Sequence, residues 1–198
     1  MTTIVGILCK DGVVLSSDKR ASKGFFIGSK ITQKILKIDD TLAVAISGQV
    51  SDAEYLVNSI RAERALVTLQ RGYPLSVKET TKLLSNVAYQ GLKSYQPYLA
   101  EFIVAGVDAF GPHVYETDMS GSVSSETFAS TGSGSPIAYG VLESNYKEGI
   151  SIEQAKVLAA NAVQAAMERD PGSGNGIDVM AIPTSVLAPE AKVVAQKR

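Results

Sequence analysis

The 198-residue sequence contains one cysteine and one histidine, and these counts exclude several kinds of site. A single cysteine cannot form a disulfide within the chain, and its solitary state fits a reducing compartment. One cysteine and one histidine cannot supply the four ligands of a tetrahedral zinc site. Cys9 lies within an apolar run, so we expect an inert buried thiol. His113 follows a Gly-Pro turn, where we expect a structural role and no catalytic triad.

Charge of one sign and long apolar runs are also lacking. The formal net charge is −1 and no run of lysine and arginine exceeds two residues, which argues against nucleic acid as a partner. No apolar run approaches membrane length, and the chain does not start with a basic stretch followed by an apolar one. We therefore expect a cytoplasmic protein that binds neither nucleic acid nor membranes.

Several cofactor and nucleophile motifs are absent as well. The chain has no G-x-x-x-x-G-K-[ST] and no G-x-S-x-G pattern. The glycine-rich stretch 172–176 leads into an expected strand and not into a helix, so it does not fit a dinucleotide site. Hydrophobic residues make up 45% and charged residues 20%, as in ordinary globular proteins. No linker divides the chain, so we expect one domain, no cofactor and a short charged tail over 188–198.

Blocks of strands alternate with pairs of helices along the chain. Apolar and β-branched runs bounded by turn residues predict the strands, and the runs of 2–9 and 13–17 form a hairpin around Asp11-Gly12. The other expected strands are 35–38, 42–46, 101–107, 113–117, 123–130 and 177–182.

Four helices are expected between these strands. Capping-box patterns at Ser51, Ser76 and Ser151 predict three helix starts, and Ser135 before Pro136 predicts the fourth. The first helix ends at Gly72, the third covers about 136–147 and the fourth ends near 169. The apolar face of the second consists of Leu83, Leu84, Val87, Ala88 and Leu92. This order predicts an α+β fold: two stacked, mainly antiparallel sheets covered by helix pairs in a four-layer α-β-β-α sandwich.

Thr2 is the most informative candidate nucleophile. It begins the first expected strand, so the start of the chain lies in a sheet. Met1 precedes this small residue, and its removal would leave Thr2 with a free α-amine. A threonine hydroxyl beside its own α-amine is a nucleophile with a built-in base.

A set of short motifs runs along the chain around this residue. They are Thr2-Thr3-x-Val5-Gly6, Asp18-Lys19-Arg20-Ala21, Lys34, Ser47-Gly48, Thr131-Gly132-Ser133-Gly134-Ser135-Pro136 and Asp170-x-x-Ser173-Gly174. In this order and spacing they resemble the β subunits of the 20S proteasome, archaeal type, which are N-terminal-nucleophile hydrolases. The resemblance covers the chain from Thr2 to about Ile182.

The resemblance implies a role for each matching residue. Thr2 is the nucleophile, Asp18 and Lys34 are its acidic and basic partners, and Gly48 lies at the oxyanion position. Ser133, Asp170 and Ser173 match residues that support the threonine and its amine by hydrogen bonding. These roles make chemical sense, because an ammonium group favours the alkoxide and an α-amine with a pKa near 8 can carry the proton at neutral pH. Without the resemblance, Asp18 and Lys34 would also fit a surface ion pair. Gly48 would fit a turn at the end of a strand, and Asp170 with Ser173 would fit a loop that ends a helix.

The resemblance also implies a pocket for the side chain that precedes the cut. Its lining residues would be Ala21, Thr32, Leu36, Ile46, Val50 and Glu54. Five of the six are uncharged, so Leu, Phe or Tyr should enter favourably, while Glu54 leaves basic side chains open. Leu36 and Ile46 also fit core positions beside the first helix.

The implied assembly is a seven-membered β ring facing a second β ring, capped by α subunits and fed with unfolded proteins by an ATP-driven unfoldase. Family members commonly carry a longer prosegment, whereas Met1 alone precedes Thr2 here, and we expect the form that keeps Met1 to be inactive. Two alternatives remain open at this point. One is a non-catalytic β subunit of the same particle, although the full set of site residues argues against it. The other is the bacterial two-ring threonine protease or an amidase of the same class.

Overall fold

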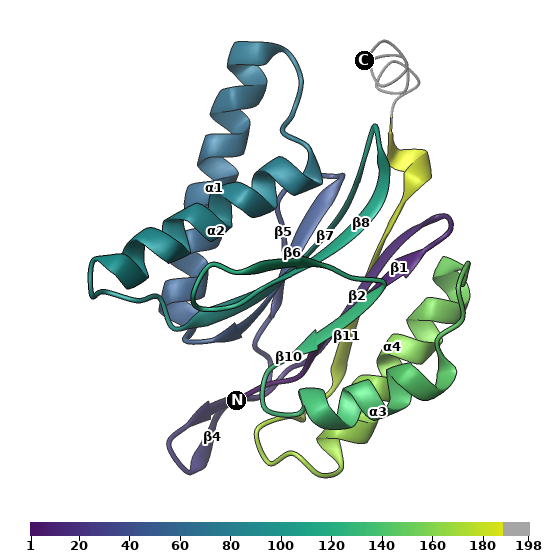
Figure 1. Ribbon diagram of the computed structural model, residues 1–198. Helices are drawn as coiled ribbons and strands as arrows, with labels where there is room; N and C mark the ends of the chain where they lie inside the picture. The colour runs from purple at the N-terminus through teal and green to yellow at the C-terminus, as the bar shows by residue number, and fades with distance from the viewer. Residues whose placement is uncertain (188–198) are drawn as a thin grey trace.

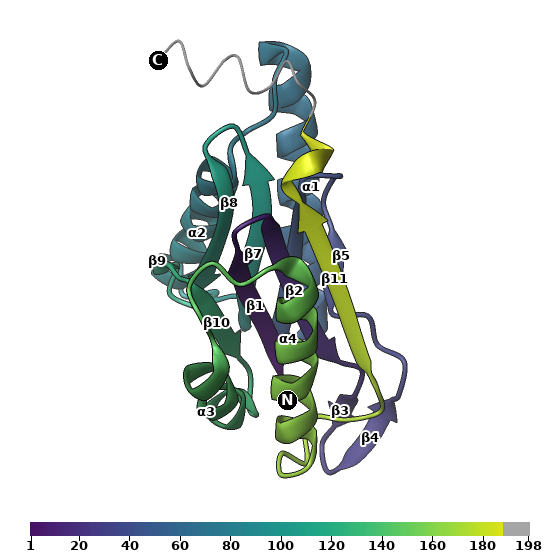
Figure 2. The same ribbon diagram turned by 90° about the vertical axis from the view of Figure 1, so that its right-hand side faces the viewer.

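The computed structural model describes residues 1–187, which form two stacked β-sheets between two pairs of helices (Figures 1 and 2). The expected tail 188–198 lies outside the described residues. All strand pairs described are antiparallel. The arrangement confirms the α+β class and the sandwich predicted from the order of elements.

The first sheet has four strands in the order β10-β1-β2-β11, and the second has five in the order β5-β6-β7-β8-β9. The first consists of β1 (Ile4–Cys9), β2 (Gly12–Asp18), β10 (Phe128–Thr131) and β11 (Ile177–Pro183). The second consists of β5 (Ile35–Lys37), β6 (Leu42–Gly48), β7 (Ala100–Asp108), β8 (Gly111–Thr117) and β9 (Val123–Ser125). A separate hairpin pairs β3 (Ala21–Lys23) with β4 (Phe26–Ser29).

One helix pair covers the outer face of each sheet (Figure 1). Helices α1 (Val50–Arg71) and α2 (Val77–Lys93) pack on the five-stranded sheet, and α3 (Ser135–Asn145) and α4 (Ile152–Met167) pack on the four-stranded one. A short 3-10 helix, η1 (Thr184–Val186), follows β11. Apolar side chains fill three layers: one under each helix pair and one between the sheets.

Strand β1 lies between two apolar layers, and this position explains why its sequence is apolar throughout. Ile4 packs between the two sheets, whereas Val5 and Ile7 pack under α3 and α4. Successive side chains of a strand point to opposite faces, so a strand buried on both faces has no position left for alternating polar residues. Gly6 lies where the sheets approach, since an added Cβ would come within 2.6 Å of Ile103.

The capping boxes at Ser76 and Ser151 are confirmed, because both serine side chains accept from the backbone N–H three residues on. The prediction at Ser51 is wrong. Helix α1 begins at Val50, its N-cap is Gln49 without a side-chain hydrogen bond, and Asp52 accepts instead from the backbone N–H of Leu99 at 2.8 Å. Ser51 therefore lies inside the first turn of the helix and cannot cap it.

Three further boundaries differ from the predictions. Residues 123–130 are two strands and not one, because the chain passes from the five-stranded sheet at β9 to the four-stranded sheet at β10. Ser135 is the first residue of α3 and Gly134 its N-cap, so Ser135 is not a cap. The first hairpin turns at Lys10-Asp11 and not at Asp11-Gly12, since Cys9 pairs with Gly12.

One residue of the expected apolar face of α2 is also wrong. Leu92, expected on that face, is 38% exposed.

Candidate active site

The hydroxyl of Thr2 lies two residues before β1, which starts at Ile4 and not at residue 2 as expected, and the register of the first sheet brings it beside Asp18. Ile4 pairs with Ser17, so the residues before β1 run alongside the end of β2. The Oγ1 of Thr2 donates to Oδ1 of Asp18 at 2.7 Å. Lys34, which precedes β5 in the other sheet, donates from Nζ to Thr2 Oγ1 and, at 2.6 Å, to Asp18 Oδ1. Thr2, Asp18 and Lys34, which are far apart in sequence, therefore form one buried cluster.

Backbone groups hold the Asp18 carboxylate in place. Its Oδ1 accepts from the N–H of Thr3 at 3.0 Å, and its Oδ2 accepts from the N–H groups of Arg20 and Gly174, each at 2.9 Å. Asp18 is fully buried. These donors and the lysine compensate for its lost hydration, so the carboxylate is fixed in orientation.

Burial lowers the pKa of Lys34 below its ordinary value of 10.5, and the negative charge of Asp18 offsets only part of that shift. The amino group is thus held next to a hydroxyl in a place with little water. An ammonium in that position favours the ionised oxygen of Thr2.

A second cluster surrounds the nitrogen of Thr2. This N–H donates to Oγ of Ser133 at 3.1 Å, and Ser133 donates in turn to Oδ2 of Asp170 at 2.7 Å. Ser173 donates to the same oxygen at 2.6 Å. Burial alone would raise the pKa of Asp170, yet the hydrogen bonds from Ser173, Ser133 and Gly172 outweigh it and bring the pKa below the ordinary 3.8. Asp170 is therefore an anion close to the Thr2 nitrogen at neutral pH.

Met1 lies at the mouth of the site. An added Cβ at Gly172 would come within 2.1 Å of Met1 Cβ, so the side chain of Met1 rests against the loop after α4. The nitrogen of Thr2 is an amide while Met1 is attached, and an amide nitrogen has no basic lone pair. The second cluster thus surrounds a nitrogen that becomes a base only when Met1 is removed.

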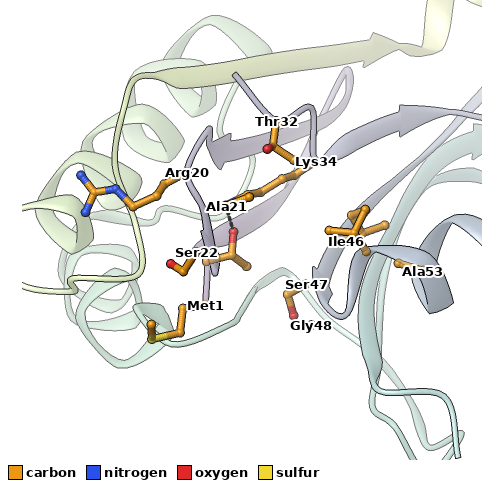
Figure 3. Close-up of a pocket in the computed structure, with 12 residues that line it drawn as sticks. Met1, Arg20, Ala21, Ser22, Thr32, Lys34, Ile46, Ser47, Gly48 and Ala53 are labelled. Carbon is orange, nitrogen blue, oxygen red and sulfur yellow. Dashed lines mark hydrogen bonds between the residues drawn. The ribbon is translucent and has the colours of Figure 1, made fainter. Parts of the chain in front are cut away.

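Gly48, the last residue of β6, lines the same cavity as Thr2. Figure 3 shows Gly48 beside Ser47 in this cavity. Its φ is +97°, a region that disfavours side chains, and an added Cβ would lie 2.3 Å from the carbonyl oxygen of Leu99. The sequence therefore needs glycine here for two separate reasons.

The cavity in Figure 3 extends from Thr2 and Lys34 to the first turn of α1. Its lining residues are Met1, Thr2, Arg20, Ala21, Ser22, Thr32, Lys34, Ile46, Ser47, Gly48, Val50 and Ala53. The structure brings four of the expected pocket residues together here: Ala21, Thr32, Ile46 and Val50. Leu36 instead packs against the core under α1 and α2, and Glu54 is exposed, and neither lines this cavity.

A second cavity adjoins Thr2 and Gly48 on the side of β7, β8 and β10. Its lining includes Glu101, Glu116 and Asp118, and no lysine or arginine among residues 1–187 lines it. Burial, followed by the nearby acidic groups, raises the pKa of Glu116, although the Tyr139 hydroxyl at 3.3 Å partly opposes this.

Sequence reasoning did not assign three residues of this region to the site. Thr3 hydrogen-bonds both Asp18 and Ser173, and Ala53 lines the first cavity. Arg20 binds Asn175 Oδ1 at 2.9 Å and the carbonyl of Pro171 at 2.8 Å, which ties the end of β2 to the loop after α4. Adjacency to Thr2 and Asp18 was the available signal for Thr3 and Arg20, whereas for Ala53 the sequence offered none.

The lone cysteine and histidine lie apart from this site. Cys9 is buried, and burial raises the pKa of its thiol to about 12. His113 Nε2 lies 3.2 Å from Asp108 Oδ1 at the β7–β8 hairpin. Among residues 1–187, no group of three His, Cys, Asp or Glu side chains is placed to hold a metal ion. In the same part of the chain, no helix is long and apolar enough to cross a membrane.

Comparison with known proteins matches residues 1–182 to the family described as "Proteasome subunit". The chain is 48% identical over 182 residues to "Proteasome subunit beta" of Methanothrix thermoacetophila, which covers 91% of this chain and 87% of that protein. It is 46% identical to the protein of the same name from Methanohalophilus mahii, over 91% and 86% of the two chains. It is 43% identical to "Proteasome subunit beta 2" of Nitrosopumilus maritimus, over 90% and 84%. The chain therefore belongs to the proteasome subunit family, and within it to the β subunits of archaeal type.

Proposed function

We propose that this chain is a catalytic β subunit, a threonine endopeptidase that cleaves unfolded proteins once Met1 has been removed. The observation that carries the proposal is the buried contact of the Thr2 hydroxyl with both Lys34 and Asp18. A buried ion pair is costly to form, and perturbed lysines in clefts are frequent at active sites. Here the Lys34–Asp18 pair contacts the Thr2 hydroxyl, which is the nucleophile of the proposed reaction.

In the first step the neutral α-amine of Thr2 takes the proton of its own hydroxyl. Oγ1 then forms a bond to the carbonyl carbon of the substrate, and the Lys34 ammonium stabilises the negative charge on Oγ1 as the proton leaves. The carbonyl oxygen becomes an oxyanion, for which the backbone N–H of Gly48 is the donor that the resemblance implies.

In the second step the protonated amine gives its proton to the departing nitrogen as the carbon–nitrogen bond breaks. The product is an ester between Thr2 and the amino-terminal part of the substrate. Water then attacks this ester, with the α-amine again as base, and releases Thr2. Asp170, held by Ser133 and Ser173, keeps a negative charge near the amine while it carries the proton.

The cavity lined by Ile46, Val50 and Ala53 supports a preference for apolar side chains before the cut. We further propose that the subunit acts in the cytoplasm, within a seven-membered β ring that faces a second β ring. In this proposal α subunits cap the rings and an ATP-driven unfoldase supplies the substrate. A closed stack would keep a peptidase of broad preference away from folded proteins.

The test uses assembled particles whose Met1 status is established by intact mass. We expect particles without Met1 to cleave peptides after Leu, Phe or Tyr, and their Thr2 to be labelled by a threonine-directed covalent inhibitor. Thr2→Ala should remove both signals, while Thr68→Ala, at a hydroxyl that binds only a helix carbonyl of α1, is the matched control.

Three outcomes would decide against the proposal. Particles free of Met1 that neither cleave peptides nor take up the label would make this a structural subunit of the ring. Activity that survives Thr2→Ala would place the nucleophile elsewhere. Activity on denatured proteins that does not require an α ring would instead favour the bacterial two-ring type of protease.

A further inference from the structure

Thr3 connects the two clusters that surround Thr2. Its backbone N–H donates to Asp18 Oδ1 at 3.0 Å, and its carbonyl accepts from the Asp18 N–H at 3.2 Å. Its side-chain Oγ1 lies 2.7 Å from Oγ of Ser173, on the other side of the chain. Thr3 is fully buried and lines neither of the two cavities at Thr2.

The extended chain that leads into β1 explains this division. Thr2 and Thr3 precede β1, and the Thr3 carbonyl already accepts from the Asp18 N–H, so their side chains alternate as in a strand. Thr2 contacts Lys34, whereas Thr3 contacts Ser173 in the loop after α4. Thr3 thus reaches the loop after α4, which Thr2 cannot reach with its side chain.

The direction of the hydrogen bonds follows from proton counting. An ionised Asp170 only accepts, so the single hydroxyl proton of Ser173 goes to Asp170 Oδ2 at 2.6 Å. Thr3 must then be the donor to Ser173. The resulting chain runs from Thr3 through Ser173 to Asp170, which also accepts from Ser133, the partner of the Thr2 nitrogen. Hydrogen bonds in such a chain strengthen one another.

The backbone is shaped around this hydroxyl. An added Cβ at Gly134 would lie 2.1 Å from Thr3 Oγ1 and 3.2 Å from Asp170 Oδ2. Gly134 is the N-cap of α3 and follows Ser133 directly. The Thr3 side chain therefore occupies the space that a larger residue at position 134 would need, next to Ser133 and the Asp170 carboxylate.

We propose that Thr3 is a positioning residue for the peptidase reaction: its hydroxyl orders Ser173 and Asp170, which hold Ser133 against the Thr2 nitrogen. The inference rests on the proposed function of Thr2. It assigns to Thr3 an effect on the proton-carrying amine and none on the binding of the peptide.

Thr3→Val tests this inference, because valine keeps the shape and removes the donor. In particles shown by intact mass to lack Met1, we expect kcat to fall about tenfold, or about 1.4 kcal/mol in activation free energy, with KM within about twofold of the original. Weaker coupling of the amine to Asp170 lowers the amine's pKa. The acidic limb of the kcat/KM profile should therefore move to lower pH, by roughly half a unit.

Two further variants separate this role from a general effect on folding. Thr3→Ser retains the hydroxyl and should restore most of kcat and the original pH profile. Thr81→Val removes another fully buried threonine hydroxyl, which binds only the Val77 carbonyl of α2, and should leave both unchanged.

The inference is overturned if Thr3→Val keeps the original kcat and pH profile, if only KM changes, or if Thr81→Val lowers kcat equally. It is also overturned if Thr3→Ser fails to restore the rate. Failure of the proposed function looks different, since particles with the original sequence and without Met1 would then be inactive and Thr2→Ala would have no effect.

Discussion

The Nζ of Lys34 lies 2.6 Å from Oδ1 of Asp18, and the exposed fractions of the two side chains are only 6% and 0%. Asp18 ends β2 in one sheet and Lys34 precedes β5 in the other, so the pair spans the space between the sheets. Such a pair contributes little net stability, because the desolvation of both charges offsets their attraction. Its contact with the Thr2 hydroxyl is what the proposed reaction needs from this pair.

Lys34→Met should both destabilise the subunit and abolish peptidase activity. Removing one partner leaves Asp18 buried without its counter-charge, so the free energy of unfolding should fall by about 3–5 kcal/mol. The matched control is Lys19→Met, which breaks a 2.7 Å pair with Asp178 whose side chains are each 34% exposed. That loss should stay below about 1 kcal/mol. Denaturant unfolding of the subunits measures both, and equal losses would contradict our account of the buried pair.

Acid should remove the stabilising contribution of Asp170. Its folded pKa is lower than the unfolded value of 3.8, so the folded state binds fewer protons over the interval between the two. The contribution is therefore complete above the unfolded pKa and is lost as the pH falls through the folded one. Against Asp170→Asn as reference, the extra stability of the original protein should shrink as the pH is lowered from 5 through this range. A difference in stability that does not change with pH would argue against an ionised Asp170.

Gly48→Ala should disturb the site more than its single methyl group implies. The φ of +97° disfavours alanine, and the new Cβ would meet the Leu99 carbonyl oxygen at 2.3 Å, so the end of β6 must shift. Because Gly48 borders both cavities, we expect peptidase activity to fall at least about tenfold, since oxyanion donors commonly contribute more than this. Gly24→Ala is the control: its φ is +60° and nothing lies within 4 Å of the added Cβ. If both variants retain full activity, Gly48 has no role in stabilising the oxyanion.

The sequence predicted the layers well, because apolar runs and capping boxes are local signals. The boxes at Ser76 and Ser151 form as expected, since each serine needs only its own helix as a partner. The box at Ser51 does not form, because the helix starts at Val50 and Ser51 already lies inside its first turn. Similarly, 123–130 reads as one strand, and only the stacking of two sheets shows that it must divide between them.

The prediction of the site likewise succeeded for residues within short motifs and failed where a residue's role depends on a distant partner. The short motifs supplied Thr2, Asp18 and Lys34, and the structure brings these residues together. The part played by Thr3 depends on a serine 170 positions further along the chain, and no periodicity reveals that distance. The pocket differed at two expected positions. Leu36 packs against the core under α1 and α2. Ala53, not Glu54, lines the cavity, because adjacent residues of a helix point about 100° apart.

Ala53 and Glu54 therefore give opposite predictions for cleavage preference. Ala53 is 1% exposed and lines the cavity with Ile46 and Val50, so Ala53→Val should narrow it. We expect kcat/KM for peptides with Phe or Tyr before the cut to fall about tenfold or more relative to peptides with Ala there. Ala53 also belongs to the core under α1 and α2, so a thermal unfolding measurement must show that the variant stays folded.

Glu54→Gln removes a charge that is exposed and outside both cavities at Thr2. An exposed carboxylate is screened by water and salt, so its removal should leave the rate of cleavage after Lys or Arg within about twofold of the original. Peptide series that differ only in the residue before the cut measure both variants under one set of conditions. If Glu54→Gln selectively slows cleavage after basic residues, the side chain reaches the substrate, and the pocket extends to Glu54 as the family resemblance implied. If it does not, Glu54 takes no part, and the apolar residues Ile46, Val50 and Ala53 of the cavity account for the preference.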